Sequence, residues 1–184
     1  MPSVLLLTNS FSTGGAETHI LSLAQGLKEA GCFVAVGSSG GTLVASLCHL
    51  GIVHIDLPLD DAKWYKILSA RRKLKKALRA YHFDVIHAHT RLSAFVAAPL
   101  AKQKHIRFVT TAHLDFRVTP LTRRLSRWGE NTLAVSEDIR AYLVREYGLS
   151  FQRIALTVNG IDTRRYSKEN LARICPAALK RQGG

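Results

Sequence analysis

Two adjacent glycines, Gly14 and Gly15, stand where a short apolar run gives way to an amphipathic segment. Glycine lets a backbone approach a ligand closely, and the start of a helix offers unpaired N–H groups at the positive end of its dipole. A phosphate or a sugar hydroxyl would fit such a loop. The stretch "STGGAET" matches neither the dinucleotide-binding glycine pattern nor the Walker loop. From these residues alone, a ligand-binding loop and a plain strand-to-helix turn are equally good interpretations.

A second group of reactive side chains lies in "HAHTR", residues 87–91. Residues two apart on a strand face the same way, so His87 and His89 could form a metal pair. No third ligand is evident in the sequence, so we predict that no metal is bound. His89 and Arg91 lie near the end of the expected strand and remain candidates for contact with a ligand.

The third group is "VTTAHLDF", residues 109–116, which ends another apolar run. His113 could donate a hydrogen bond into a cleft or carry a proton. Thr111 and Asp115 lie close by in the sequence and are candidate binding residues. A histidine that only packs or caps a helix is the alternative.

Two further positions are weaker candidates. Ser136 has the residue type of a helix N-cap and precedes two acidic residues. Asn159 and Gly160 form a turn signal after the last apolar run. Either position could belong to a ligand site or to the scaffold.

The elements that must position these residues alternate along the chain. Apolar runs predict strands near 3–8, 33–38, 52–58, 83–89, 106–113, 131–136 and 153–162. Helical patterns lie between them, near 16–30, 41–51, 63–81, 91–103, 120–129 and 136–147. Pro99 falls inside one expected helix and should kink or shorten it. The alternation predicts an α/β fold with three layers, a Rossmann-like parallel sheet of about seven strands covered by helices on both faces. Ligands bind such sheets outside the carboxyl ends of the strands.

Composition and charge narrow the class of protein. The chain has 184 residues, of which 47% are hydrophobic, and this is enough for a packed core. No apolar run is long enough to cross a bilayer. Three cysteines, an odd number in apolar surroundings, favour buried thiols in a reducing cytoplasm. The net charge of +13 indicates an anionic partner.

Part of that charge lies in one expected helix, because residues 62–83 contain no acidic residue. Eight basic residues lie among apolar residues at helical spacing, which should pack on the sheet. The basic face is either simply solvated or a docking surface for anionic lipid, with Arg72, Lys73 and Lys76 as the residues to test.

Taken together, these segments resemble the N-terminal domain of GT-B glycosyltransferases, specifically the retaining group called family 4. The matching stretches are "GGAETHILSLAQGLKEAG", "FDVIHAHTRLSAFVAA", "VTTAH", "LAVSEDIRAYLVREYG" and "RIALTVNGID". They occur in the order of the family and cover about residues 2–166. The resemblance implies two Rossmann-like domains that face each other across a cleft. The N-terminal domain mainly holds the acceptor, and the C-terminal domain mainly holds a nucleotide-sugar donor.

The resemblance also implies roles for individual residues. Gly14 and Gly15 would lie beside the donor diphosphate and the acceptor. His113 would lie beside the transferred sugar and assist the reaction. Asn159 and Gly160 would lie near the crossing into the second domain. No cofactor and no catalytic metal are expected, because family 4 generally needs none.

The chain departs from the family in one respect. Residues 1–166 correspond to the N-terminal domain, residues 167–184 form a basic tail, and no E-x7-E glutamate pair follows. We therefore expect an acceptor-binding domain for a polysaccharide or lipid-linked acceptor in lipopolysaccharide or capsule synthesis, inactive or weakly active alone. Self-association and a peripheral place at the cytoplasmic face of the membrane are further expectations. The alternative is a non-catalytic module for an anionic glycan or lipid surface. Nucleic acid is not expected, since no RRM, KH, zinc-finger or helix-turn-helix signature is present.

Overall fold

The computed structural model describes residues 1–157 and contains a seven-stranded parallel sheet of order β3-β2-β1-β4-β5-β6-β7. The strands are β1 (Ser3–Leu7), β2 (Phe33–Ser38), β3 (Val53–Asp56), β4 (Val85–Ala88), β5 (Arg107–Ala112), β6 (Asn131–Ala134) and β7 (Ile154–Leu156). The helices are α1 (Gly15–Glu29), α2 (Val44–His49), α3 (Trp64–Ala80), α4 (Arg91–Lys104), α5 (Pro120–Leu125) and α6 (Glu137–Tyr147), with a short 3-10 helix at Phe151–Arg153. The predicted fold class is confirmed.

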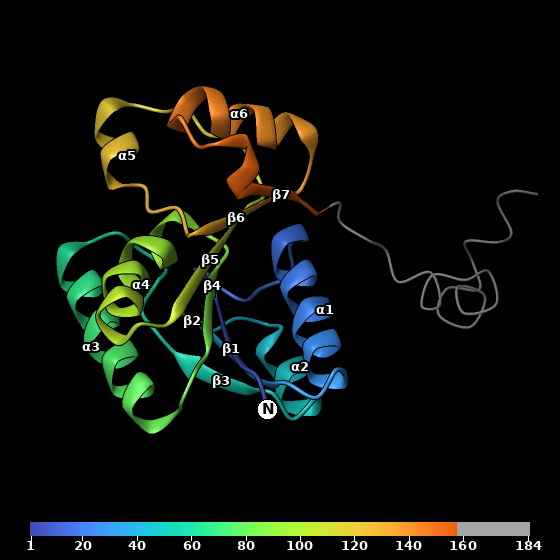
Figure 1. Ribbon diagram of the computed structural model, residues 1–184. Helices are drawn as coiled ribbons and strands as arrows, with labels where there is room; N and C mark the ends of the chain where they lie inside the picture. Colours follow the sequence, from blue (N-terminus) through green and yellow to red (C-terminus); the bar gives the residue numbers. More distant parts are fainter. Residues whose placement is uncertain (158–184) are drawn as a thin grey trace, which may run out of the picture.

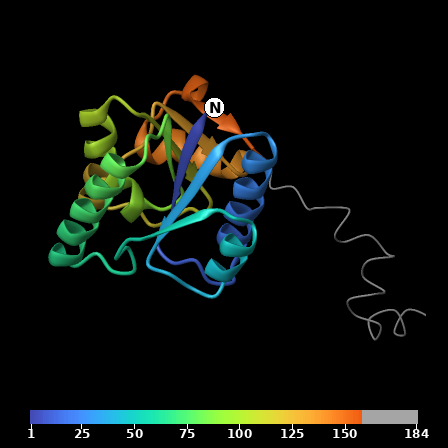
Figure 2. The ribbon, with the colours of Figure 1, turned by 90° about the horizontal axis from the view of Figure 1, so that it is seen from below.

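The helices cover both faces of the sheet (Figure 1, Figure 2). Alternation along β1 explains how, because successive side chains of a strand point to opposite faces. Leu5 and Leu7 pack in one core with α3 and α4, whereas Val4 and Leu6 pack in another with α1 and α2. A third, smaller core lies under α6, against β6 and β7.

The order of the strands creates a switch point between β1 and β4. From β1 the chain builds β2 and β3 on one side, and it then returns to build β4 to β7 on the other side. Connections at such a point leave in opposite directions and open a crevice at the carboxyl ends of the two strands. The loops after β1, β4 and β5 carry the first three candidate groups to this crevice.

Pro99 does not shorten α4, which runs on to Lys104. A proline lacks the N–H that would bond to the carbonyl four residues earlier, here the carbonyl of Phe95. The Nη2 group of Arg71 on α3 donates to that carbonyl at 3.2 Å, and the Arg71 guanidinium lies 5.0 Å from the centre of the Phe95 ring. Arg71 therefore joins two helices and is not part of a solvated basic face.

The rest of α3 agrees with the expectation only in part. Leu74 and Leu78 are buried against the sheet, but Trp64 at the start of the helix is 76% exposed. Arg72 and Lys76 are exposed as predicted, and Lys73 is exposed with its ammonium 2.5 Å from Asp56. No helix within residues 1–157 has the length and apolar character needed to cross a bilayer.

The predictions for the cysteines and for the C-terminal residues have different outcomes. The thiol of Cys48 is exposed and that of Cys32 is half-buried, so the prediction of buried thiols is wrong for Cys48. Cys175, the boundary at residue 166, the turn of Asn159 and Gly160, and the tail 167–184 lie outside the described residues.

Candidate functional site

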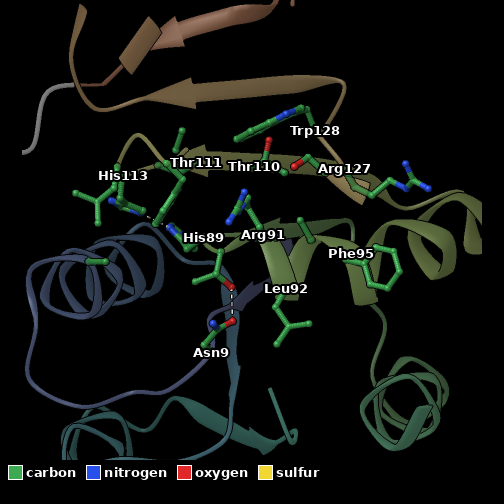
Figure 3. Close-up of a pocket in the computed structure, with 18 of the residues that line it drawn as sticks. Asn9, His89, Arg91, Leu92, Phe95, Thr110, Thr111, His113, Arg127 and Trp128 are labelled. Atoms are coloured by element: carbon green, nitrogen blue, oxygen red, sulfur yellow. Dashed lines mark hydrogen bonds between the residues drawn. The ribbon is translucent and has the colours of Figure 1, made fainter. Parts of the chain in front are cut away.

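A cavity of about 900 Å³ opens at the carboxyl ends of the central strands, within the size range of small-ligand sites. Its lining includes Gly15 at the start of α1, His89 and Arg91 after β4, and Thr111 and His113 from β5 and the loop behind it. Figure 3 shows His89, Arg91, Thr111 and His113 around this space, with Asn9 below them. The tertiary structure thus brings together five candidates that lie up to about a hundred residues apart in sequence.

Histidines form a connected group at the edge of the cavity. The Nδ1 atom of His89 and the Nε2 atom of His113 are hydrogen-bonded at 3.1 Å. His87 is buried, and its Nε2 atom is hydrogen-bonded to the Thr111 hydroxyl at 2.7 Å. The ring centres of His87, in β4, and of His89, directly after β4, lie 4.1 Å apart. The bond between His89 and His113 leaves Nδ1 of His113 as the ring nitrogen available to a ligand.

The local environment keeps these imidazoles neutral at pH 7. Burial lowers the pKa of His113 to about 4, and the nearby His19 adds to the shift. Burial likewise lowers the pKa of His87 to about 3, helped by His113 and His19. Burial also holds the pKa of His89 well below its ordinary value, with further lowering by its three histidine neighbours. A neutral imidazole can both donate to and accept from a sugar hydroxyl, and an imidazolium can only donate.

The sequence interpretation missed His19. Its ring centre lies 5.3 Å from that of His113 and 6.0 Å from that of His89. His19 is one helical turn beyond Gly15 on α1, so its proximity depends on how α1 packs at the end of the sheet. No local pattern marks it.

The glycine loop leaves the beginning of α1 open. Gly14 is the N-cap of the helix, in extended backbone geometry and without a side-chain cap. A Cβ atom at Gly15 would meet no other atom within 4 Å. The first-turn N–H groups are therefore available beside the cavity, although Glu17 in the same turn offsets part of the positive helix dipole.

The other candidates have different surroundings. Ser136 is the N-cap of α6, where its hydroxyl accepts from the N–H of Ile139 at 3.2 Å, and it does not line the cavity. Asp115 is exposed and does not line the cavity. Within residues 1–157, no three His, Cys, Asp or Glu side chains are grouped as a metal site. The absence of a metal requirement stays a prediction.

An aromatic wall was also absent from the candidates. Phe116, Trp128, Tyr142 and Tyr147 line the cavity beside Arg91. The Tyr142 hydroxyl donates to the Phe116 carbonyl at 2.8 Å and accepts from the Phe116 N–H at 3.1 Å, which fixes the loop after β5 against α6. These aromatic residues come from three separate segments, so only their packing reveals them.

Comparison with solved structures shows the same architecture. A glycosyltransferase from Rickettsia africae superposes with a TM-score of 0.77 at 21% identity, over 97% of this chain and 49% of that one. HepE from Anabaena, solved with UDP-glucose, gives a TM-score of 0.72 at 17% identity, over 96% of this chain and 50% of that one. The lipopolysaccharide outer core galactosyltransferase WaaB gives 0.68 at 14% identity, over 88% of this chain and 46% of that one. The chain thus spans about half the length of these structures.

Comparison of sequences assigns the family. No curated protein sequence matches the chain. The profile of Glycosyltransferase Family 4 matches residues 13–165, which is most of the chain and includes the glycine loop, the histidine group and the aromatic wall. The expected family is therefore confirmed, and the chain belongs to glycosyltransferase family 4.

Proposed function

We propose that this chain supplies the acceptor-binding domain of a retaining glycosyltransferase that moves a sugar from a nucleotide-sugar to a polysaccharide or lipid-linked acceptor. The observation that carries this proposal is the neutral His113, held by His89 at the mouth of the cavity. Nδ1 of His113 would bond to a hydroxyl of the transferred sugar and so orient it.

The open start of α1 would act on the leaving group. Backbone N–H groups and the helix dipole stabilise anions, and they stabilise charge most when they are fixed in place before the reaction. In this position they would offset the negative charge that develops on the departing diphosphate. No side chain competes for those N–H groups as an N-cap.

The donor is proposed to be held by a second domain that faces this cavity. HepE was solved with UDP-glucose, which supports a nucleotide-sugar as donor here. Because the described domain holds only one side of such a cleft, we expect weak activity or none from this chain alone. The proposed transfer uses neither a cofactor nor a catalytic metal.

We propose that the protein lies peripherally at the cytoplasmic face of the membrane, because its proposed acceptor is lipid-linked. WaaB is a lipopolysaccharide galactosyltransferase, which supports an acceptor of the lipopolysaccharide or capsule type. The exposed Arg72, Lys73 and Lys76, with Trp64 at the start of the same helix, offer an anionic headgroup both charge and an aromatic anchor. If no transfer chemistry occurs, the same surface supports the second candidate, a binding module for anionic lipid.

The proposed transfer can be tested in a hybrid enzyme. This chain would be fused to the half of HepE that it does not cover, and release of UDP from UDP-glucose would be measured with lipopolysaccharide-derived acceptors. We expect acceptor-dependent release and a newly formed glycosidic bond. A folded hybrid that binds UDP-glucose but transfers sugar to none of the acceptors would argue against the proposal.

A further inference from the structure

One side of the cavity combines a guanidinium with aromatic rings. The Arg91 guanidinium lies 4.7 Å from the centre of the Phe116 ring. The Trp128 and Tyr147 rings are 5.0 Å apart, and Tyr142 lies 5.8 Å from Tyr147. Figure 3 shows Arg91 and Trp128 in the lining of the same space as His89 and His113.

This side of the cavity is rich in unused hydrogen-bond donors. On this side of the cavity, two buried donors have no hydrogen-bond partner within residues 1–157, Nη1 of Arg91 and Nε1 of Trp128. The Tyr147 hydroxyl also has no close partner there, and the side chains of Arg91, Ser126 and Tyr142 lie near it. Arginine and tryptophan side chains can only donate. A buried polar group without a partner is costly, and such a group in a cavity indicates a missing ligand atom. The missing atoms must be acceptors.

The charges around the cavity favour an anionic group as the missing hydrogen-bond acceptor. Arginine side chains carry a positive charge in proteins. Three carboxylates line the same cavity, of which two are paired with lysines: Asp60 with Lys66 at 2.5 Å and Asp61 with Lys63 at 3.2 Å. The third, Glu17 in the first turn of α1, makes no ion pair within residues 1–157, and it stands against two unpaired arginines of the lining, Arg91 and Arg127. Arg91 makes no ion pair with any residue of the described part of the chain.

We propose that Arg91, Trp128 and Tyr147 form a subsite for a sugar residue that carries a phosphate or a carboxylate, so that the acceptor is an anionic glycan. The planar guanidinium of arginine can donate two parallel hydrogen bonds to a pair of oxygens in either group. The aromatic rings would cover the apolar side of the sugar ring. This inference rests on the proposed acceptor role of the domain and names the class of acceptor.

The two tryptophans of the chain make the subsite measurable. A Trp64→Phe variant leaves Trp128 as the sole tryptophan, and its fluorescence should report occupancy of the cavity. The probes are glucose 6-phosphate, glucuronate, glucose, inorganic phosphate and UDP. We expect glucose 6-phosphate or glucuronate to bind at least ~10-fold more tightly than glucose, as one hydrogen bond to a charged group would give. Whichever of the two binds more tightly identifies the anionic group.

Variants of Arg91 test the cause of that preference. Arg91→Gln should abolish the difference between charged and neutral sugars, and Arg91→Lys should reduce it. Tyr147→Phe should weaken binding of the charged sugars about 3-fold. Arg107→Gln is the matched control, because Arg107 is exposed at the opposite end of β5 and its loss changes the net charge equally. Far-ultraviolet circular dichroism would confirm that each variant is folded.

Several results would overturn the inference. Equal affinity for glucose and the charged sugars would show that charge is not recognised. Inorganic phosphate as tight as glucose 6-phosphate would indicate a simple anion site. If UDP bound more tightly than every other probe, and if Arg91→Gln abolished that binding, Arg91 would be assigned to the donor diphosphate. Transfer by the hybrid enzyme to neutral acceptors would leave the proposed function intact and would still reject the anionic subsite.

Discussion

Nδ1 of His89 and Nε2 of His113 are hydrogen-bonded at 3.1 Å, so the tautomers of the two rings are linked. If His89 donates its Nδ1 proton, His113 accepts at Nε2 and presents a Nδ1–H group to the cavity. His89 is then a positioning residue for His113. In the hybrid enzyme, His113→Ala should lower kcat by ~100-fold or more, the usual contribution of a placed proton donor or acceptor.

A pair of substitutions at His89 separates orientation from packing. An asparagine amide can occupy the position of Nδ1 and donate to His113, whereas leucine can only fill the space. We expect His89→Asn to keep most of kcat and His89→Leu to lower it by ~10-fold with KM little changed. Equal turnover of the two variants would reject the positioning role of His89.

Acid should destabilise the domain through its neutral histidines. The pKa of His87 is lowered to about 3 and that of His113 to about 4, from 6.5 in the unfolded chain. Between those values and pH 6.5 the unfolded chain binds more protons. The contribution of these histidines to the free energy of unfolding is therefore fully present above about pH 6.5. It falls as the pH drops, by up to ~1.4 kcal/mol per pH unit for each buried histidine.

Urea unfolding at pH 7.5, 6.0 and 5.0 measures that slope. His87→Gln keeps a side-chain nitrogen near Thr111 but removes the titration, so its slope should be shallower by about one proton. His49→Gln, at an exposed position on α2, is the control and should leave the slope unchanged. A slope for His87→Gln equal to that of the wild-type chain would contradict this account.

A substitution at Gly15 should affect ligand binding without affecting the stability of the domain. It is the first residue of α1, its φ is not in the left-handed region, and a Cβ atom there meets open space. Gly15→Ala should therefore change the free energy of unfolding by no more than ~0.5 kcal/mol, with any gain coming from the better helix propensity of alanine. If the loop receives the diphosphate, the same change should raise KM for UDP-glucose in the hybrid enzyme.

Gly26→Ala is the matched control in the same helix. Gly26 is exposed, and its Cβ would also meet no atom within 4 Å. This variant should raise stability by up to ~1 kcal/mol without affecting KM. A KM change of the same size in both variants would remove the glycine loop from the proposed site.

Arg71 and Pro99 should be energetically coupled through the Phe95 carbonyl. Arg71→Ala leaves that carbonyl without its donor and should cost ~1–2 kcal/mol. In a Pro99→Ala background a backbone N–H returns to the helix and can take the carbonyl, so the cost of Arg71→Ala should fall by ~0.5–1 kcal/mol. Urea unfolding of the four chains measures the coupling, and strict additivity would refute it. Arg72→Ala, on the exposed face, is the control and should change stability by no more than ~0.5 kcal/mol.

The basic face of α3 makes a prediction about membranes. The chain should sediment with anionic phosphatidylglycerol vesicles, with up to ~1 kcal/mol from each basic residue at the surface, and binding should weaken as salt rises. Neutral phosphatidylcholine vesicles should not bring the chain down. Reversal of Arg72, Lys73 and Lys76 to glutamate should abolish sedimentation.

The control for that experiment has the same change in charge elsewhere. Lys102, Lys104 and Arg107 are exposed where α4 leads into β5. Their reversal to glutamate should leave most of the sedimentation. An equal loss in both triple variants would show that only net charge matters and that α3 is not a docking surface.

The sequence by itself determined the parallel sheet and the end of it at which the candidate site is predicted. Apolar runs and helical spacing are local properties, and they sufficed to predict the seven strands and the helices between them. The rule that ligands bind at the carboxyl ends of such strands then favoured candidates there, of which Gly14, Asp115 and Ser136 do not line the cavity. Five others do: Gly15, His89, Arg91, Thr111 and His113.

Only the tertiary structure decided which side chains meet. His19 reaches His113 because of the way α1 packs, and Trp128 reaches Tyr147 because the segment after α5 lies against α6. Arg71 is a charged residue of the kind usually found in contact with solvent, but it donates to the Phe95 carbonyl. That carbonyl lacks a backbone donor because Pro99 has no N–H. Contacts between distant segments depend on packing angles and on unpaired groups, and periodicity along one segment carries no information about either.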